Sequence, residues 1–285
     1  MKLIRDPKKL QVILEQARKK GRSVGFVPTM GALHVGHLSL VRASNLENDV
    51  TVVSIFVNPA QFGLNEDYSK YPRVLAEDMK KLRTVKTHYL FCPSDAAMYP
   101  AGYATFLEVS PRLANVLCGK FRPGHFRGVA TVVAKLLNIT GPCRLYLGAK
   151  DFQQVAVIRQ LVIDLNMKVQ VRVMPTVREK DGLAMSSRNR YLSPDERTRA
   201  LAISRVLFGL KADLLKKRGT LARLKGRAVK ELKRHVDRVQ YLEIVDPGTL
   251  APVRKYQENL ALLAACFVGK TRLIDNVILR NRGKR

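Results

Sequence analysis

The sequence has no apolar run that approaches the roughly 20 residues needed to cross a bilayer. Its first residues, Met1 to Asp6, turn charged at once and lack the apolar core of a signal peptide. Its four cysteines are scattered and show no C-x-x-C spacing, which argues against a disulfide framework or a zinc site. We therefore expect a cytoplasmic protein with no membrane-spanning segment.

Acidic residues are also scarce. Only 23 of them stand against 51 lysines and arginines, which gives a formal charge of +28 and a pI near 10.4. The excess is dense between Arg205 and Arg238, where no interleaved aromatic residues suggest base stacking. We interpret this stretch as a solvated helical face, and we expect contact with nucleic acid only through non-specific charge attraction.

What the chain does contain is a pattern of alternating strands and helices. Its 285 residues are 46% hydrophobic, which is typical of a folded globular protein. Apolar strands at 24–27, 50–57, 88–92, 145–147 and 168–173 alternate with helical segments, and this predicts a Rossmann-like parallel sheet over residues 1–176. Beyond it, two helices followed by three short strands predict a smaller α+β domain over 177–285.

The stretch from Val24 to Leu40 is the most informative. An apolar strand is expected to close at Pro28, and Gly31 follows in a tight turn. His34 and His37 then lie three residues apart at the start of a helical pattern, so both imidazoles can share one face. A helix N-terminus suits a polyphosphate, and imidazoles there can donate to phosphoryl oxygens. Metal ligation and ordinary packing are the alternatives, although the other three histidines show no ligand spacing.

Several blocks, taken together, carry a family resemblance. The segment Val27-Pro-Thr-Met-Gly-Ala-Leu-His-Val-Gly-His37 resembles the nucleotide signature of the pantoate–β-alanine ligases, a family of the H-x-G-H nucleotidylyltransferase superfamily. Blocks at 56–62, 122–129, 148–151, 185–188 and 271–276 also match that family, in its order and spacing. Val35 and Ala149 depart from it, because a polar residue and Gly-Glu-Lys-Asp are usual at these two places.

The resemblance implies two half-reactions at one site. Pantoate would attack ATP in the presence of Mg²⁺ to give pantoyl adenylate and pyrophosphate, and the amine of β-alanine would then displace AMP. Alignment of two anions with charge stabilisation suffices, and no protein nucleophile is required. The resemblance also implies a homodimer and a C-terminal domain that acts as a lid.

The implied site falls into three groups. The expected ATP contacts are Met30, Gly31, Ala32, Leu33, His34, Val35, Gly36, His37, Gly148, Ala149, Lys150, Asp151, Val177, Met185, Ser186, Ser187 and Arg188. Among these, the expected catalytic residues are His37, His34, Lys150, Ser186, Ser187 and Arg188. Gln61 and Gln154 are expected to hold pantoate, with Gln61 also near β-alanine.

Two other functions are compatible with the same residues. The chain could be another H-x-G-H nucleotidylyltransferase that acts on a different acid or phosphate. It could also be a basic nucleic-acid-binding protein whose nucleotide site has degenerated, although no nucleic-acid-binding motif is present.

Overall fold

The computed structural model describes residues 1–63 and 66–280. Within them, the chain forms two compact units whose main division falls between Pro175 and Thr176. The second unit also takes in two short segments, Asn115–Cys118 and Lys150–Gln153, that precede this division in the sequence. None of the helices in the described residues is long and apolar enough to span a membrane.

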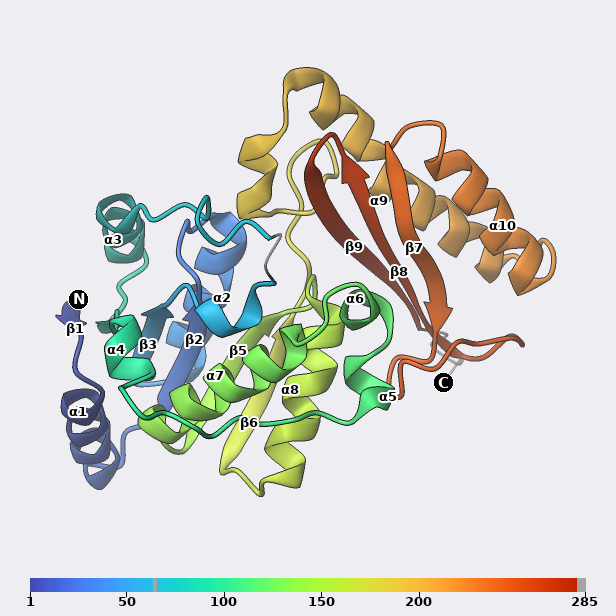
Figure 1. The fold of residues 1–285 in the computed structure, drawn as a ribbon. Helices are drawn as coiled ribbons and strands as arrows, with labels where there is room; N and C mark the ends of the chain where they lie inside the picture. The colour runs from blue at the N-terminus through green and yellow to red at the C-terminus, as the bar shows by residue number, and fades with distance from the viewer. Residues whose placement is uncertain (64–65, 281–285) are drawn as a thin grey trace. The chain divides into compact units, whose positions relative to one another are not determined.

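The first unit is built on a six-stranded parallel sheet (Figure 1). The strand order is β1-β4-β3-β2-β5-β6, and every neighbouring pair is parallel. The strands are β1 (Lys2–Ile4), β2 (Val24–Thr29), β3 (Val50–Ile55), β4 (Tyr89–Phe91), β5 (Cys143–Gly148) and β6 (Val169–Met174). This confirms the predicted Rossmann-like sheet, and it adds β1, which is only three residues long.

Helices connect the strands of this unit and cover both faces of the sheet. They are α1 (Pro7–Lys19), α2 (Val35–Glu47), α3 (Leu75–Thr84), α4 (Asp95–Met98), α5 (Pro111–Ala114), α6 (Leu117–Lys120), α7 (His125–Thr140) and α8 (Phe152–Asp164), with the 3-10 turn η1 (Pro59–Gln61) after β3. The first residues of α6 and of α8 belong to the second unit. The connections β2–α2–β3 and β3–α3–β4 run toward one edge of the sheet, whereas β1–α1–β2, β4–α7–β5 and β5–α8–β6 run toward the other. Because such crossovers are right-handed, the two sets of helices cover opposite faces.

The reversal between β2 and β5 fixes where a ligand can bind. The chain leaves β2 toward β3, then returns to form β5 on the other side of β2. In open α/β sheets, ligands bind beyond the carboxyl ends of the strands at such a switch point. The loops that follow β2 and β5 contain residues 30–37 and 148–149 of the first unit, so the topology brings predicted ATP contacts from both loops to the same edge.

The prediction that Pro28 closes its strand is wrong, because β2 continues to Thr29. Pro28 is paired with Ser54 of β3, whereas the ladder between β2 and β5 covers only Gly25 and Phe26. A proline is tolerated in a strand where the nitrogen faces an unpaired side. The one-sided pairing at Pro28 provides that side.

The second unit contains a three-stranded antiparallel sheet and two helices (Figure 1). The elements are α9 (Pro194–Leu215), α10 (Leu221–Leu232), β7 (Arg238–Val245), β8 (Asn259–Val268) and β9 (Thr271–Arg280), preceded by the 3-10 turn η2 (Ser187–Tyr191). Ser193 caps α9 in a capping box with Glu196. Leucines and alanines from both helices and from all three strands share one apolar core.

Candidate active site

The turn after β2 has a defined, strained backbone. Gly31 and Ala32 have φ angles of 82° and 50°, both in the left-handed region. The Thr29 hydroxyl donates to the Ser54 carbonyl oxygen at 2.7 Å and accepts the backbone N–H of Gly31 at 3.1 Å. A methyl group at Gly31 would lie 3.0 Å from the Ile55 side chain. The tight turn predicted at Gly31 is therefore confirmed, and only glycine fits it without strain.

His34 and His37 lie together where α2 begins. His34 is the N-cap residue and His37 stands at the third helical position, in a capping-box arrangement. The two rings stack with centroids 4.0 Å apart and planes 25° from parallel. The Nδ1 atom of His37 accepts the backbone N–H of His34 at 3.4 Å. In a neutral His37 ring the proton then resides on Nε2.

Gln61 is fixed by groups from two neighbouring loops. It ends η1, directly beyond β3, and is only 8% exposed. Its Oε1 accepts from the Asn58 side chain at 3.2 Å, and its Nε2 donates to the Met30 sulfur at 2.9 Å. The structure therefore brings Gln61 and Met30 together, as expected of residues that share a site at the carboxyl ends of β2 and β3.

Asn58, which the sequence motifs did not single out, supports Gln61. Its side chain donates to the Gly128 carbonyl oxygen at 3.1 Å and accepts the Tyr99 hydroxyl at 2.7 Å. Asn58 is 1% exposed, so its amide has a fixed orientation and in turn orients Gln61. Burial, with the nearby charges of Tyr103 and Asp95, raises the pKa of Tyr99 well above its ordinary value, so this hydroxyl stays a donor.

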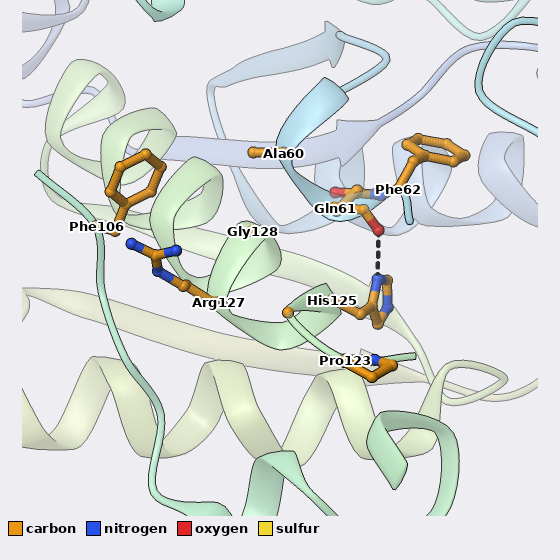
Figure 2. A pocket seen from close by; sticks show the side chains of 9 residues that line it. Ala60, Gln61, Phe62, Phe106, Pro123, His125, Arg127 and Gly128 are labelled. Carbon is orange, nitrogen blue, oxygen red and sulfur yellow. Dashed lines mark hydrogen bonds between the residues drawn. The ribbon is translucent and has the colours of Figure 1, made fainter. Parts of the chain in front are cut away.

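A cavity of about 120 Å³ opens beside Gln61 (Figure 2). Its lining includes Phe62 and Phe106, and His125 and Arg127 from the first turn of α7. Arg127 turns aside in Figure 2: its guanidinium stacks on Phe106, 4.1 Å from the ring centroid. The polar side chains of the lining are those of Gln61, His125 and Arg127.

His125 anchors the Gln61 loop. Arg122 donates to His125 Nε2 at 2.9 Å, so the proton on the other ring nitrogen is donated to the Gln61 carbonyl oxygen at 2.8 Å. Arg122 is itself paired with Glu66. Burial alone would raise the pKa of Glu66, but hydrogen bonds and charge from Arg122 outweigh it and lower that pKa below its ordinary value. The loop therefore rests on an ionised pair.

Gly128 is the contact point between α7 and η1. A methyl group there would lie 2.1 Å from the Ala60 carbonyl oxygen, which is closer than atoms can approach. No positive φ is involved, so the requirement is for space alone. The absence of a side chain at Gly128 lets the helix support the loop that carries Gln61.

The segment after β5 leads into α8. The backbone N–H of Ala149 donates to the Met174 carbonyl oxygen of β6 at 2.8 Å, which continues the sheet past Gly148. Gln154 follows on the first turn of α8. The preceding residue, Gln153, has a structural role. Its side-chain amide donates to the Val116 carbonyl oxygen at 2.7 Å and accepts the backbone N–H of Cys118 at 2.8 Å.

In the second unit, Lys150 and Asp151 are tied to the C-terminal sheet. The Lys150 side chain is 19% exposed, and its Nζ lies 3.5 Å from the Asp151 carboxylate. The Asn276 amide of β9 donates to the Lys150 carbonyl oxygen at 2.8 Å. Its neighbour Asp275 accepts both guanidinium nitrogens of Arg178 at 2.7 and 2.9 Å. Adjacent residues of one strand thereby hold the Lys150 segment and the residue after Val177.

Val177 and Met185 face each other across a short hairpin. The Met185 N–H donates to the Val177 carbonyl oxygen at 3.0 Å. The hairpin turns at Gly182, which has a φ of 93°. Ser186 caps η2 by accepting the Arg188 N–H at 3.3 Å. Arg197 braces the hairpin from α9 through ion pairs with Glu179 and Asp181, both at 2.6 Å. The second unit thus groups Val177 with Met185, Ser186, Ser187 and Arg188.

A metal site formed by the protein alone is not visible. Among the described residues, no group of three or more histidine, cysteine, aspartate or glutamate side chains is placed to hold a metal ion. Mg²⁺ commonly keeps several waters and binds through one or two carboxylates together with substrate phosphates. The residues present are compatible with a metal that arrives bound to a nucleotide.

A family model described as pantoate-beta-alanine ligase matches residues 2–278. The chain belongs to this family. This match confirms the resemblance to the pantoate–β-alanine ligases that the sequence motifs indicated, and the observed fold agrees with it. The comparisons favour neither of the two alternative functions.

Relatives match over nearly their whole length. The chain is 50% identical to a pantothenate synthetase of Sulfurihydrogenibium sp. (97% of this chain, 99% of the relative) and 52% identical to pantothenate synthetase 1 of Bradyrhizobium diazoefficiens (98% of each). A solved pantothenate synthetase from Thermus thermophilus superimposes with a TM-score of 0.91 at 43% identity, covering 97% and 99% of the two chains. A pantoate-β-alanine ligase from Francisella tularensis, complexed with β-γ ATP and β-alanine, gives 0.80 at 39% identity, covering 98% and 97%.

Proposed function

We propose that this protein joins pantoate to β-alanine at the expense of ATP. The observation that carries the proposal is the match of one ligase family model to residues 2–278. The Francisella relative, which is complexed with β-γ ATP and β-alanine, supports two of the three substrates. The site described above supports the same chemistry, because it offers imidazoles, amides, hydroxyls and cations for anionic reactants.

In the first half-reaction a pantoate carboxylate oxygen attacks the α-phosphorus of ATP. Pyrophosphate leaves, and pantoyl adenylate remains. His37 Nε2 and His34 donate to the phosphates at the N-terminus of α2, and Lys150 adds a positive charge. Ser186, Ser187 and Arg188 follow the departing β- and γ-phosphates on the hairpin, and the C-terminal unit acts as a lid.

In the second half-reaction the β-alanine amine attacks the acyl carbon. The acyl–oxygen bond breaks, AMP leaves, and the amine loses a proton as the amide of pantothenate forms. Gln61 and Gln154 hold pantoate throughout, and Gln61 also faces the incoming amine. Pre-alignment of the reactants and donors aimed at developing charge account for the rate enhancement.

Mg²⁺ enters with ATP as the nucleotide's counter-ion, which agrees with the donor set described above. Asp151 is the carboxylate best placed along the chain to meet it, since it follows the β5 loop at the start of α8. We further propose a homodimer formed through the N-terminal unit, which size-exclusion chromatography with light scattering would test.

AMP release tests the proposed function. We expect AMP to accumulate only when ATP, pantoate and β-alanine are all present, in equal amount to pantothenate. AMP formed equally well without pantoate, or with an unrelated acid in its place, would assign the chain to another reaction.

A further inference from the structure

A buried carboxylate holds the turn that leads into α2. Asp78 lies on α3 and is 1% exposed. One of its oxygens accepts the backbone N–H of Ala32 at 2.8 Å, and the other accepts the backbone N–H of Leu33 at 2.7 Å. Burying a carboxylate is costly, and hydrogen bonds to both of its oxygens offset that cost. Both donors come from the segment expected to contact ATP.

The backbone of this turn explains why the carboxylate fits. Gly31 and Ala32 are both left-handed, and successive N–H groups in such turns converge on a concave anion site. A methyl group at Gly31 would lie 3.1 Å from Asp78 Oδ2, so the carboxylate fills that concavity. The N–H groups that could have cradled a phosphate are already bonded to the protein's own anion.

Lys81, three residues after Asp78 on α3, bonds the same turn. Its Nζ donates to the Leu33 carbonyl oxygen at 2.8 Å. Residues three apart share a helix face, so Asp78 and Lys81 act together. Between them they bond both backbone groups of Leu33, the residue before the N-cap His34. The positive charge of Lys81 also offsets the field of the carboxylate on a nearby anion.

We propose that Asp78, assisted by Lys81, is a positioning residue for ATP. By fixing the turn at 31–33, it sets the direction in which the chain enters α2 and so the placement of His34 and His37. It also assigns the phosphate contacts to the two imidazoles and the α2 N-terminus, since the turn's N–H groups are occupied. This inference rests on the proposed function and adds to it a residue that does not touch the substrates.

The test is Asp78→Asn, which keeps the side chain's size but turns an amide NH₂ toward one of the two backbone donors. A displacement near 1 Å in a positioning element can cost about 100-fold in rate. We expect kcat/KM for ATP to fall at least ~10-fold, while KM for β-alanine stays within about twofold. Equilibrium dialysis against ATP should show the same weakening without turnover.

Asp49→Asn is the matched control. Asp49 also accepts a backbone N–H, that of Ser23 at 2.8 Å, together with the Ser23 hydroxyl at 2.7 Å. It lies at the amino ends of β2 and β3, opposite the edge that bears the site. Both variants are assayed well below their melting temperatures, and the control should keep wild-type kinetics for ATP.

Three outcomes overturn the positioning role. These are wild-type ATP kinetics in Asp78→Asn, an equal rise of all three KM values, or an equal ATP defect in Asp49→Asn. If Asp78→Asn does not fold, Lys81→Met takes its place: an ATP-specific loss supports the proposal, and unchanged ATP kinetics contradict it. A wild-type protein that releases no AMP with pantoate and β-alanine would refute the proposed function, whereas ATP dialysis would still test Asp78.

Discussion

The side-chain amide of Asn276 donates a 2.8 Å hydrogen bond to the backbone carbonyl oxygen of Lys150, 126 residues earlier in the chain. Asn276 is 5% exposed, so this bond is shielded from water. The neighbouring Asp275 holds Arg178 in the same way. A C-terminal strand that contributes no predicted contact to ATP therefore supports two segments that do.

Replacing Asn276 should weaken the use of ATP. Asn276→Ala leaves the Lys150 carbonyl oxygen without this donor, at a cost of about 1–3 kcal/mol. We expect kcat/KM for ATP to fall roughly 10-fold, by AMP release under saturating pantoate and β-alanine. Asn45→Ala is the control, because Asn45 also donates to a backbone carbonyl oxygen, that of Val85, away from the site. Equal ATP defects in both variants would mean general destabilisation.

His37→Ala removes the imidazole that we propose donates to the phosphates through Nε2. Loss of one transition-state donor typically costs about 100-fold or more in turnover, and we expect that loss in kcat with little change in the melting temperature. His235→Ala serves as the control, since His235 bonds Glu231 on α10 and not a predicted substrate contact. Unchanged turnover would remove His37 from the mechanism.

Gly128→Ala should act on pantoate. The new methyl group would push η1 away from α7 and displace Gln61, so we expect KM for pantoate to rise at least ~10-fold and stability to fall by about 1–3 kcal/mol. Gly226→Ala in α10 is the matched helical control, because a methyl group there meets nothing within 4 Å. That control should be neutral or more stable by about 0.5–1 kcal/mol. A pantoate KM unchanged in Gly128→Ala would contradict the packing account.

Glu66 should contribute to the loss of unfolding free energy as the pH falls. Its pKa is lowered in the folded state, so its contribution is complete above the ordinary carboxyl pKa and disappears as pH falls through the folded value. Urea unfolding from about pH 6 to about pH 3 should show a shallower loss of free energy in Glu66→Gln than in wild type. Parallel curves for the two proteins would show that the Arg122–Glu66 pair is not the source.

The charge of +28 predicts nucleic-acid binding that is weak and salt-sensitive. Attraction of this kind releases counter-ions and falls steeply with salt concentration. Fluorescence anisotropy with a labelled oligonucleotide should detect binding near 0.05 M salt and lose it by about 0.2 M. Tight binding that survives higher salt would instead indicate a dedicated nucleic-acid site.

The parallel sheet and the β2–α2 motif could be predicted because both are indicated by patterns of residues that are close together in the sequence. Val24 to His37 contains a strand, a glycine turn and two histidines at helical spacing, and the structure stacks those histidines. The error at Pro28 arose because a local rule cannot show which side of a strand is unpaired.

The supporting residues were not predictable in the same way. Asp78 bonds a turn 46 residues away, and Asn58 bonds Gly128 across 70 residues. Neither residue belongs to a short pattern that points to such a partner, because the contact exists only once α3 or α7 has packed. Gly128 inside an apolar helix was the one available signal, since a helical glycine often marks a close approach.

The central claim, that pantoate is activated as an adenylate, is tested most directly with pantoate labelled in its carboxylate with oxygen-18. Attack on the α-phosphorus leaves one labelled oxygen on phosphorus when the amine displaces AMP, so mass spectrometry should find the label in AMP. Label in inorganic phosphate with formation of ADP, or AMP without label, would contradict the account.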